Sequence, residues 1–139
     1  MRVWCAVKAL IEDKNRYLII RQEVKDKLFW DLPGGRVEHG ESPYDTLLRE
    51  VKEETKLDIK IIKPVGIWWF FRLKDNDQVV CNTFLCKPKH LDVGINSNPA
   101  DENIKEFRWL TKEEILDLDI YPSLKELIKS IKKKNKSKN

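Results

Sequence analysis

Three glutamates stand at positions where a helix would bring them together. Residues 49–55 read REVKEET, so Glu50, Glu53 and Glu54 follow the i, i+3, i+4 spacing of one helical face. Like charges at this spacing destabilise an isolated helix by roughly 0.2–0.5 kcal/mol per pair. A chain that folds this segment as a helix must therefore hold it by other contacts and supply its acidic face with positive charge.

The residues around the glutamates predict that the helix does form. Ser42 offers an N-cap hydroxyl, and Pro43 suits the first helical position. At about 100° per residue, the residues expected on the buried side are Tyr44, Leu47, Leu48, Val51 and Thr55. The glutamates occupy the neighbouring sector. The segment therefore predicts a helix that packs on a core and carries an acidic border.

A hard divalent cation would turn the repulsion between the glutamates into attraction. Mg²⁺ and Mn²⁺ prefer oxygen ligands, and Mg²⁺ typically binds through one or two carboxylates plus substrate phosphates. The Pro33-Gly34-Gly35 segment before the helix, which we expect to be irregular, would add backbone groups. A metal held there would polarise a phosphoryl oxygen and generate hydroxide. Taken alone, however, three glutamates on a helix more often form a solvent-exposed face.

Strand patterns precede and follow this central helix. By their hydrophobic patterns, the expected strands are residues 2–12, 17–21, 58–73 with a break near residues 64–66, 79–87 and 106–110. Two further helices are expected at residues 112–118, where Thr111 opens a capping box, and 122–133. Because strands run together on both sides of one helix, the pattern indicates a mixed α/β sandwich rather than a repeating βαβ sheet.

Length and composition fit one domain with a buried core. The chain has 139 residues, of which 41% are hydrophobic and 36% are charged. No apolar run approaches the roughly 18 residues that span a membrane, and the N-terminus does not read as a signal peptide. We therefore expect a cytoplasmic protein. Cys5, Cys81 and Cys86 lack CxxC spacing, so we expect three buried free thiols.

The net charge of +4 is concentrated at the C-terminal end, where residues 129–139 read KSIKKKNKSKN. Without this end the body is near neutral, so it is not a basic platform for nucleic acid. We expect one domain over residues 1–132 and a basic, disordered tail over residues 133–139. Contact of the tail with RNA is the less favoured alternative.

The glycine loop and the helix together resemble a known signature. Gly35, five residues, Glu41, seven residues and then REVKEETKL resemble the box of the Nudix hydrolases, G-x5-E-x7-R-E-U-x-E-E-x-G-U, where U is a bulky aliphatic residue. The flanking segments WDLPGG and RWLTKEEI also look like those of the family. The resemblance covers most of the chain and implies an α/β/α sandwich with a mixed β-sheet.

One position departs from the box, because Lys56 stands where the family has glycine. Glycine there would end the helix in the left-handed conformation. Lysine in that conformation costs about 1 kcal/mol more, so we expect the helix to run on and end near Leu57-Asp58. Lys56 is not on the acidic face, so the departure concerns the exit turn and not the glutamates.

The resemblance implies hydrolysis of a nucleoside diphosphate linked to another group, with water attacking a phosphorus of the pyrophosphate. It implies that Mg²⁺ or Mn²⁺ is held by Glu50, Glu53 and Glu54 with the backbone carbonyl of Gly34. Arg49 would hold a glutamate in position through a charge-assisted hydrogen bond.

The general base stays open at this point. The resemblance allows a box glutamate, Glu50 or Glu53, or an acidic residue on a later loop. Glu102, beside Asp101, is the candidate on that loop, and ordinary loop polarity explains it equally well. Glu41 would support the loop or reach a metal through water.

The nucleotide base needs an apolar wall, and the backbone of Gly35 would approach the substrate. Residues 68–71 read WWFF, whose successive side chains point to both faces of a strand. We take Trp68, Phe70 and Trp30 as candidates for base contact. For any one of these aromatic residues, a place in the core is the more common explanation.

The substrate is poorly encoded. The window after the box reads Arg72-Leu73-Lys74-Asp75 and lacks the proline or tyrosine that marks certain subfamilies. The short chain looks most like the MutT-like enzymes that release pyrophosphate from nucleoside triphosphates. ADP-ribose, a nucleotide sugar or an RNA 5′ end are alternative substrates, and a non-catalytic nucleotide sensor is an alternative class. We expect a monomer or homodimer that binds a small nucleotide and no membrane.

Overall fold

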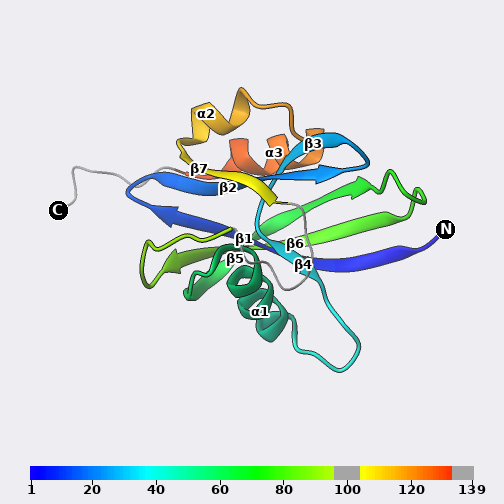
Figure 1. Cartoon of the computed structure of the whole chain (residues 1–139), viewed down its shortest axis with the longest axis horizontal. Coiled ribbons are helices and arrows are strands. Elements are labelled where there is room, and N and C mark those ends of the chain that lie inside the picture. The colour runs from blue at the N-terminus through cyan, green and yellow to red at the C-terminus, as the bar shows by residue number, and fades with distance from the viewer. Residues whose placement is uncertain (96–103, 133–139) are drawn as a thin grey trace.

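The structure is a computed structural model that describes residues 1–95 and 104–132. Its strands are β1 (Val3–Asp13), β2 (Arg16–Val24), β3 (Lys27–Asp31), β4 (Gly34–Arg36), β5 (Ile59–Phe71), β6 (Gln78–Pro88) and β7 (Ile104–Leu110). Its helices are α1 (Pro43–Thr55), α2 (Lys112–Leu116) and α3 (Pro122–Ser130). Figure 1 shows α1 on one side of the sheet and α2 and α3 on the other. The expected α/β/α sandwich is confirmed.

The sheet is mixed because its central strand, β1, pairs with both parallel and antiparallel neighbours. Within the described residues it has seven strands in the order β3-β2-β1-β6-β5, with β4 joined to β1 and β7 joined to β2. Strand β1 runs parallel to β6 and antiparallel to β2 and β4. The expected hairpin of β1 with β2 is present, but only Glu12↔Tyr17 and Asp13↔Arg16 join these strands, next to their turn.

The two glycines before α1 lie in a strand, so the expectation that they are irregular was wrong. Strand β4 pairs with β1 through Lys8↔Gly34, Val7↔Gly35 and Ala6↔Arg36. A Cβ on Gly34 would lie 2.0 Å from the carbonyl oxygen of Val7, and the φ of Gly34 is +149°. Only glycine permits this approach. The pairing places both glycines against α1.

The expected break at residues 64–66 is an irregularity inside one long strand. Strand β5 continues from Ile59 to Phe71 and changes register against β6 between Ile61 and Lys63 and again between Pro64 and Gly66. Such irregularities bend a strand without ending it. The strand thus continues to Phe71, which pairs with Gln78 of β6.

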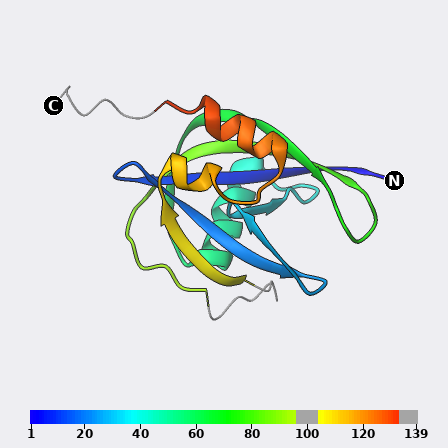
Figure 2. The same cartoon turned by 90° about the horizontal axis from the view of Figure 1, so that it is seen from above.

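Two hydrophobic clusters cover the two faces of the sheet. On the α1 side, Leu47 and Val51 pack with Val7, Ala9 and Ile11 of β1. The other cluster joins β1 to residues of α2, α3 and the segment between them: Ala6, Leu10, Ile115, Ile120, Leu124, Leu127 and Ile128. Figure 2 shows α2 and α3 from the side that they cover. Strand β1 is therefore covered on both faces.

Helix α1 begins as expected but is rotated relative to the expected stripe. The Ser42 hydroxyl accepts the N–H of Asp45 at 3.1 Å. Leu47, Val51 and Thr55 are buried as expected, whereas Tyr44 and Leu48 are exposed. Thr46, Glu50 and Glu54 are buried in their place. The acidic face thus turns inward toward β4, because the glycines leave room for it.

The end of α1 corrects the expectation for Lys56. The helix stops at Thr55, and Lys56 itself adopts the left-handed conformation with φ +67°. Its N–H donates to the carbonyl of Lys52 at 3.0 Å. The chain therefore keeps the usual geometry of a glycine exit while bearing a lysine.

The cysteines are not all buried. Cys81 and Cys86 are buried as expected, and burial raises the pKa of each thiol to about 12. Cys5 is exposed, because it lies near the start of β1 and belongs to neither hydrophobic cluster. None of the described helices has the length and apolar character needed to cross a membrane.

Candidate active site

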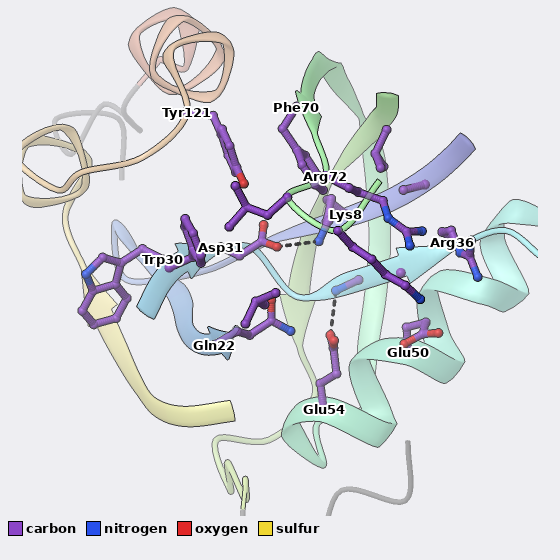
Figure 3. A pocket seen from close by; sticks show the side chains of 18 of the residues that line it. Lys8, Gln22, Trp30, Asp31, Arg36, Glu50, Glu54, Phe70, Arg72 and Tyr121 are labelled. Carbon is purple, nitrogen blue, oxygen red and sulfur yellow. Dashed lines mark hydrogen bonds and ion pairs between the residues drawn. The ribbon is translucent and has the colours of Figure 1, made fainter. Parts of the chain in front are cut away.

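A cavity of about 630 Å³ opens beside α1 and β4. Its lining carries both signs of charge: Glu50 and Glu54 come from α1, whereas Arg36, Arg72 and Lys74 come from β4 and the β5–β6 turn. Figure 3 shows the acidic helix on one side and Phe70 and Tyr121 across the cavity from it. A ligand in this space would meet carboxylates, cations and aromatic rings together.

The two glycines of β4 hold the acidic face of α1 close to the sheet. Glu54 is only 1% exposed, and its Oε1 accepts the N–H of Gly34 at 2.8 Å (Figure 3). A Cβ at Gly35 would lie 2.4 Å from Cδ of Glu50. Glycine at both positions therefore lets two carboxyl groups lie against the strand.

Arg49 supplies positive charge to the other glutamates. Its Nε donates to Oε2 of Glu41 at 2.8 Å and its Nη2 to Oε1 of Glu41 at 2.9 Å. Its Nη1 donates to Glu50 at 3.2 Å and to Glu53 at 3.4 Å. Glu41 also accepts the hydroxyl of Thr46 at 2.7 Å. The hydrogen bonds from Arg49 and Thr46 lower the pKa of Glu41 to about 2, so this carboxylate stays ionised at neutral pH.

The carboxylates have the chemistry of a magnesium site, although they are not gathered into a closed cage. Among the described residues, no three His, Cys, Asp or Glu side chains already form a metal-binding group. Glu50 and Glu54 line the cavity next to Gly34, while Glu53 lies beside Arg49. Hard oxygen donors of this kind fit a cation that takes its other ligands from phosphate and water. A Mg²⁺ or Mn²⁺ ion is thus compatible with the residues present.

The structure places the sequence candidates in different parts of the molecule. Gly34, Gly35, Glu50, Glu54, Trp30 and Phe70 all line the cavity. Trp68 does not line it and is 0% exposed, so its ring belongs to the core between the sheet and α3. Glu102, together with Asp101 and the tail over 133–139, lies outside the described residues.

Several residues that line the cavity were not predicted from the sequence. Lys8, Asp31 and Tyr121 lie in its wall, and Arg36, Arg72 and Lys74 add cations. Lys8 offered the clearest signal, because it is a charged residue inside the apolar run of a strand that is covered on both faces. The others come from turns and strand ends, which sequence patterns describe poorly.

The site and fold agree with comparison to known proteins. The family model of the NUDIX domain matches residues 2–131. The chain therefore belongs to the Nudix family of pyrophosphohydrolases. A solved MutT protein from Methanosarcina mazei has a TM-score of 0.79 and 26% sequence identity, with 92% of this chain and 91% of that chain covered.

Curated relatives carry several different substrates in their names. Nucleoside triphosphatase NudI from Enterobacter is 27% identical over 132 residues, which cover 86% of this chain and 90% of that protein. An ADP-ribose pyrophosphatase from Methanocaldococcus jannaschii is 32% identical, covering 86% of this chain and 64% of that protein. The chain spans only 46% and 50% of two 8-oxo-dGTP diphosphatase relatives from Bacillus subtilis and Proteus vulgaris. These names do not select one substrate.

Proposed function

We propose that this Nudix pyrophosphohydrolase uses Mg²⁺ or Mn²⁺ to cleave a nucleoside triphosphate into a monophosphate and pyrophosphate. The observation that carries the proposal is the mixed charge of one cavity. Carboxylates of α1 lie in the same lining as Arg36, Arg72 and Lys74. A polyphosphate needs both, because cations bind its oxygens directly while carboxylates bind it through metal ions.

Each side chain then has a role that its position supports. Glu50 and Glu54 hold the metal ion, with Gly34 beside them, and Arg49 positions Glu50 and Glu53. When bound, the metal ion polarises the phosphoryl oxygen and lowers the pKa of water. The basic side chains of the lining neutralise the rest of the phosphate chain.

The general base is assigned to Glu50. This carboxylate lines the cavity, whereas Glu53 contacts Arg49 and does not line it. A base must come within hydrogen-bond reach of the attacking water, directly or through one further water. Glu50 accepts the proton of water in this proposal, and Arg49, at 3.2 Å, keeps its carboxylate in place.

The substrate is tested by comparing kcat/KM across ribo- and deoxynucleoside triphosphates, ADP-ribose, nucleotide sugars and dinucleoside polyphosphates with Mg²⁺. The proposal expects a triphosphate to lead and pyrophosphate to be the released product. A lead of more than about a hundredfold for ADP-ribose or a nucleotide sugar, about 2.7 kcal/mol in transition-state preference, would overturn the triphosphate substrate. Nucleotide binding without any turnover would instead favour a sensing module.

An RNA 5′ end is the remaining alternative, since one relative from Pelagibacter ubique is named an RNA pyrophosphohydrolase. The lysine-rich tail over residues 133–139 is the feature that would favour it. RNA affinity that weakens steeply with salt, and loses that dependence when the chain ends after Lys132, would support RNA. Unchanged turnover and stability after this truncation would support the free nucleotide.

A further inference from the structure

A buried ion pair lies in the wall of the cavity. The ammonium of Lys8, in β1, lies 2.9 Å from Oδ2 of Asp31, in β3, and the two side chains are 8% and 12% exposed. Both residues line the cavity, and Figure 3 shows their contact between the acidic helix and Tyr121. The pair is thus reached from the cavity and hardly from elsewhere.

The pair has hydrogen-bonding capacity to spare. Lys8 donates to Asp31 and, at 3.3 Å, to the carbonyl of Leu32. Asp31 in turn accepts from Lys8 and, through Oδ1 at 2.7 Å, from the N–H of Leu32. An ammonium has three donors and a carboxylate about four acceptor positions. Among the contacts of the described residues, one donor of Lys8 and further acceptor positions of Asp31 are not used and remain for a ligand.

A stabilising role alone does not account for this pair. Buried ion pairs are replaced by apolar residues of similar volume with little loss and often with a gain. An ion pair in the wall of an open cavity is the arrangement expected of groups that recognise a polar ligand.

The aromatic residues near the pair suit a flat ligand. The rings of Phe70 and Tyr121 stack with centroids 4.8 Å apart and an interplanar angle of 19°. Both line the cavity that contains Lys8 and Asp31. A planar base placed in this part of the cavity would therefore meet an aromatic wall and the charged pair together.

We propose that Lys8 and Asp31 select a 6-oxopurine base, with guanine preferred. Asp31 accepts the ring N1–H and the 2-amino group, and Lys8 donates to the 6-oxo oxygen. Adenine reverses this pattern, because it presents an amino donor and an unprotonated ring nitrogen at the same edge. Hypoxanthine lacks the 2-amino group and should rank between them. The inference rests on the proposed nucleotide substrate and names its base.

The direct test is equilibrium binding of nucleoside monophosphates in chelator, followed by kcat/KM for the matching triphosphates with Mg²⁺. Binding of GMP should exceed that of AMP by at least about tenfold, with IMP between them, since the wrong edge leaves a buried charge unsatisfied. The same order is expected in kcat/KM. Equal values across the bases in both measurements would overturn the inference.

The variant Asp31→Asn keeps the size of the side chain and removes the charge. It should bring the preference for guanine over adenine below about threefold in both binding and kcat/KM. The matched control is Asp58→Asn, whose carboxylate is exposed and paired with Lys52, and it should keep the guanine preference. An equal loss for every monophosphate would instead show that the pair binds phosphate, and a retained guanine preference would also overturn the assignment.

Two further outcomes separate this inference from the proposed function. If Asp31→Asn does not fold in a thermal melt, the double variant Lys8→Gln with Asp31→Asn provides a neutral hydrogen-bonded pair and should fold without base preference. A guanine preference in binding without cleavage of triphosphates would refute the proposed function and keep the inference. Cleavage of all four triphosphates with equal kcat/KM, together with equal binding of the monophosphates, would support the proposed function and refute the base preference.

Discussion

The backbone N–H of Gly34 donates to Oε1 of Glu54 at 2.8 Å and joins β4 to the acidic face of α1. The contact fixes a carboxyl group that is almost fully buried, and it does so beside the cavity. A preorganised carboxylate avoids the cost of ordering it when a metal ion and substrate bind. The glycines before the helix and the glutamates within it thus act as one unit.

Gly35→Ala should reduce turnover without unfolding the protein. Its Cβ would lie 2.4 Å from Cδ of Glu50, so that carboxyl group must move. Displacement of a catalytic group by about 1 Å costs on the order of a hundredfold in rate. The measurement is kcat on the best triphosphate together with a thermal melt.

The matched control for this change is Gly94→Ala. Its Cβ would meet only the flexible side chain of Lys56, with Cγ at 3.1 Å, so turnover should stay near that of the unchanged protein. Equal rates for both alanine variants would show that Glu50 does not need its observed position.

Lys56→Gly should stabilise the protein. Lys56 has φ +67°, where glycine carries no steric penalty, so the free energy of unfolding should rise by about 1 kcal/mol. Lys52→Gly is the control, because this exposed residue lies inside α1, where glycine should lower stability by about 1 kcal/mol. Urea titration measures both, and a loss of stability in Lys56→Gly would contradict the assigned exit turn.

The contacts of Glu41 should make stability depend on acid pH. Hydrogen bonds from Arg49 and Thr46 lower its pKa from 4.5 to about 2. A lowered pKa in the folded state stabilises the protein above the unfolded value, and this contribution is lost as the pH falls from about 4.5 toward 2. Glu41→Gln should therefore show a shallower fall in unfolding free energy over this window.

The control for that titration is Glu126→Gln on the exposed surface of α3, where the carboxylate pairs only with Lys129 among the described residues. Its profile should run parallel to that of the unchanged protein. If the profile of Glu41→Gln also runs parallel to that of the unchanged protein, the pair of Glu41 with Arg49 does not contribute to the pH dependence of the unfolding free energy.

The thiols should differ in reactivity. Cys5 is exposed, whereas Cys81 and Cys86 are buried with the pKa of each raised to about 12. The thiolate is the reactive species, so a thiol reagent should titrate one cysteine quickly in the native protein and all three after denaturation. Cys5→Ser should remove the fast phase. Rapid reaction of two or three thiols in the native protein would contradict the burial of Cys81 and Cys86 in β6.

Local spacing predicted the parts of the site that lie close together in the chain. The local signals for α1 are Ser42, Pro43 and the glutamates, and none of these signals depends on contacts with the strands. The strand that contains Gly34 and Gly35 was missed because two glycines have no strand preference of their own. Their extended conformation depends on pairing with β1. The inward turn of Glu50 and Glu54 follows from that same pairing, so no helical pattern could reveal it.

The ion pair of Lys8 and Asp31 was out of reach for a related reason. Its members are 23 residues apart on different strands, and neither residue has a local pattern that names its partner. Trp68, by contrast, was predicted to be a candidate for base contact but lies in the core. Alternation along a strand identifies its two faces but does not say which face the helices cover. Its place in the core depends on α3, which comes more than fifty residues later in the chain.

The central claim is that carboxylates of α1 hold a metal ion that drives cleavage. The measurement is release of pyrophosphate from a nucleoside triphosphate by the unchanged protein and by Glu54→Gln, each titrated with Mg²⁺. The glutamine carbonyl still accepts the N–H of Gly34, so unfolding free energy should change by less than about 1 kcal/mol. Turnover of the variant should fall at least a hundredfold, and turnover of the unchanged protein should vanish in excess chelator and return with Mg²⁺. Activity that persists in chelator, or a variant that keeps its full rate, would contradict the account.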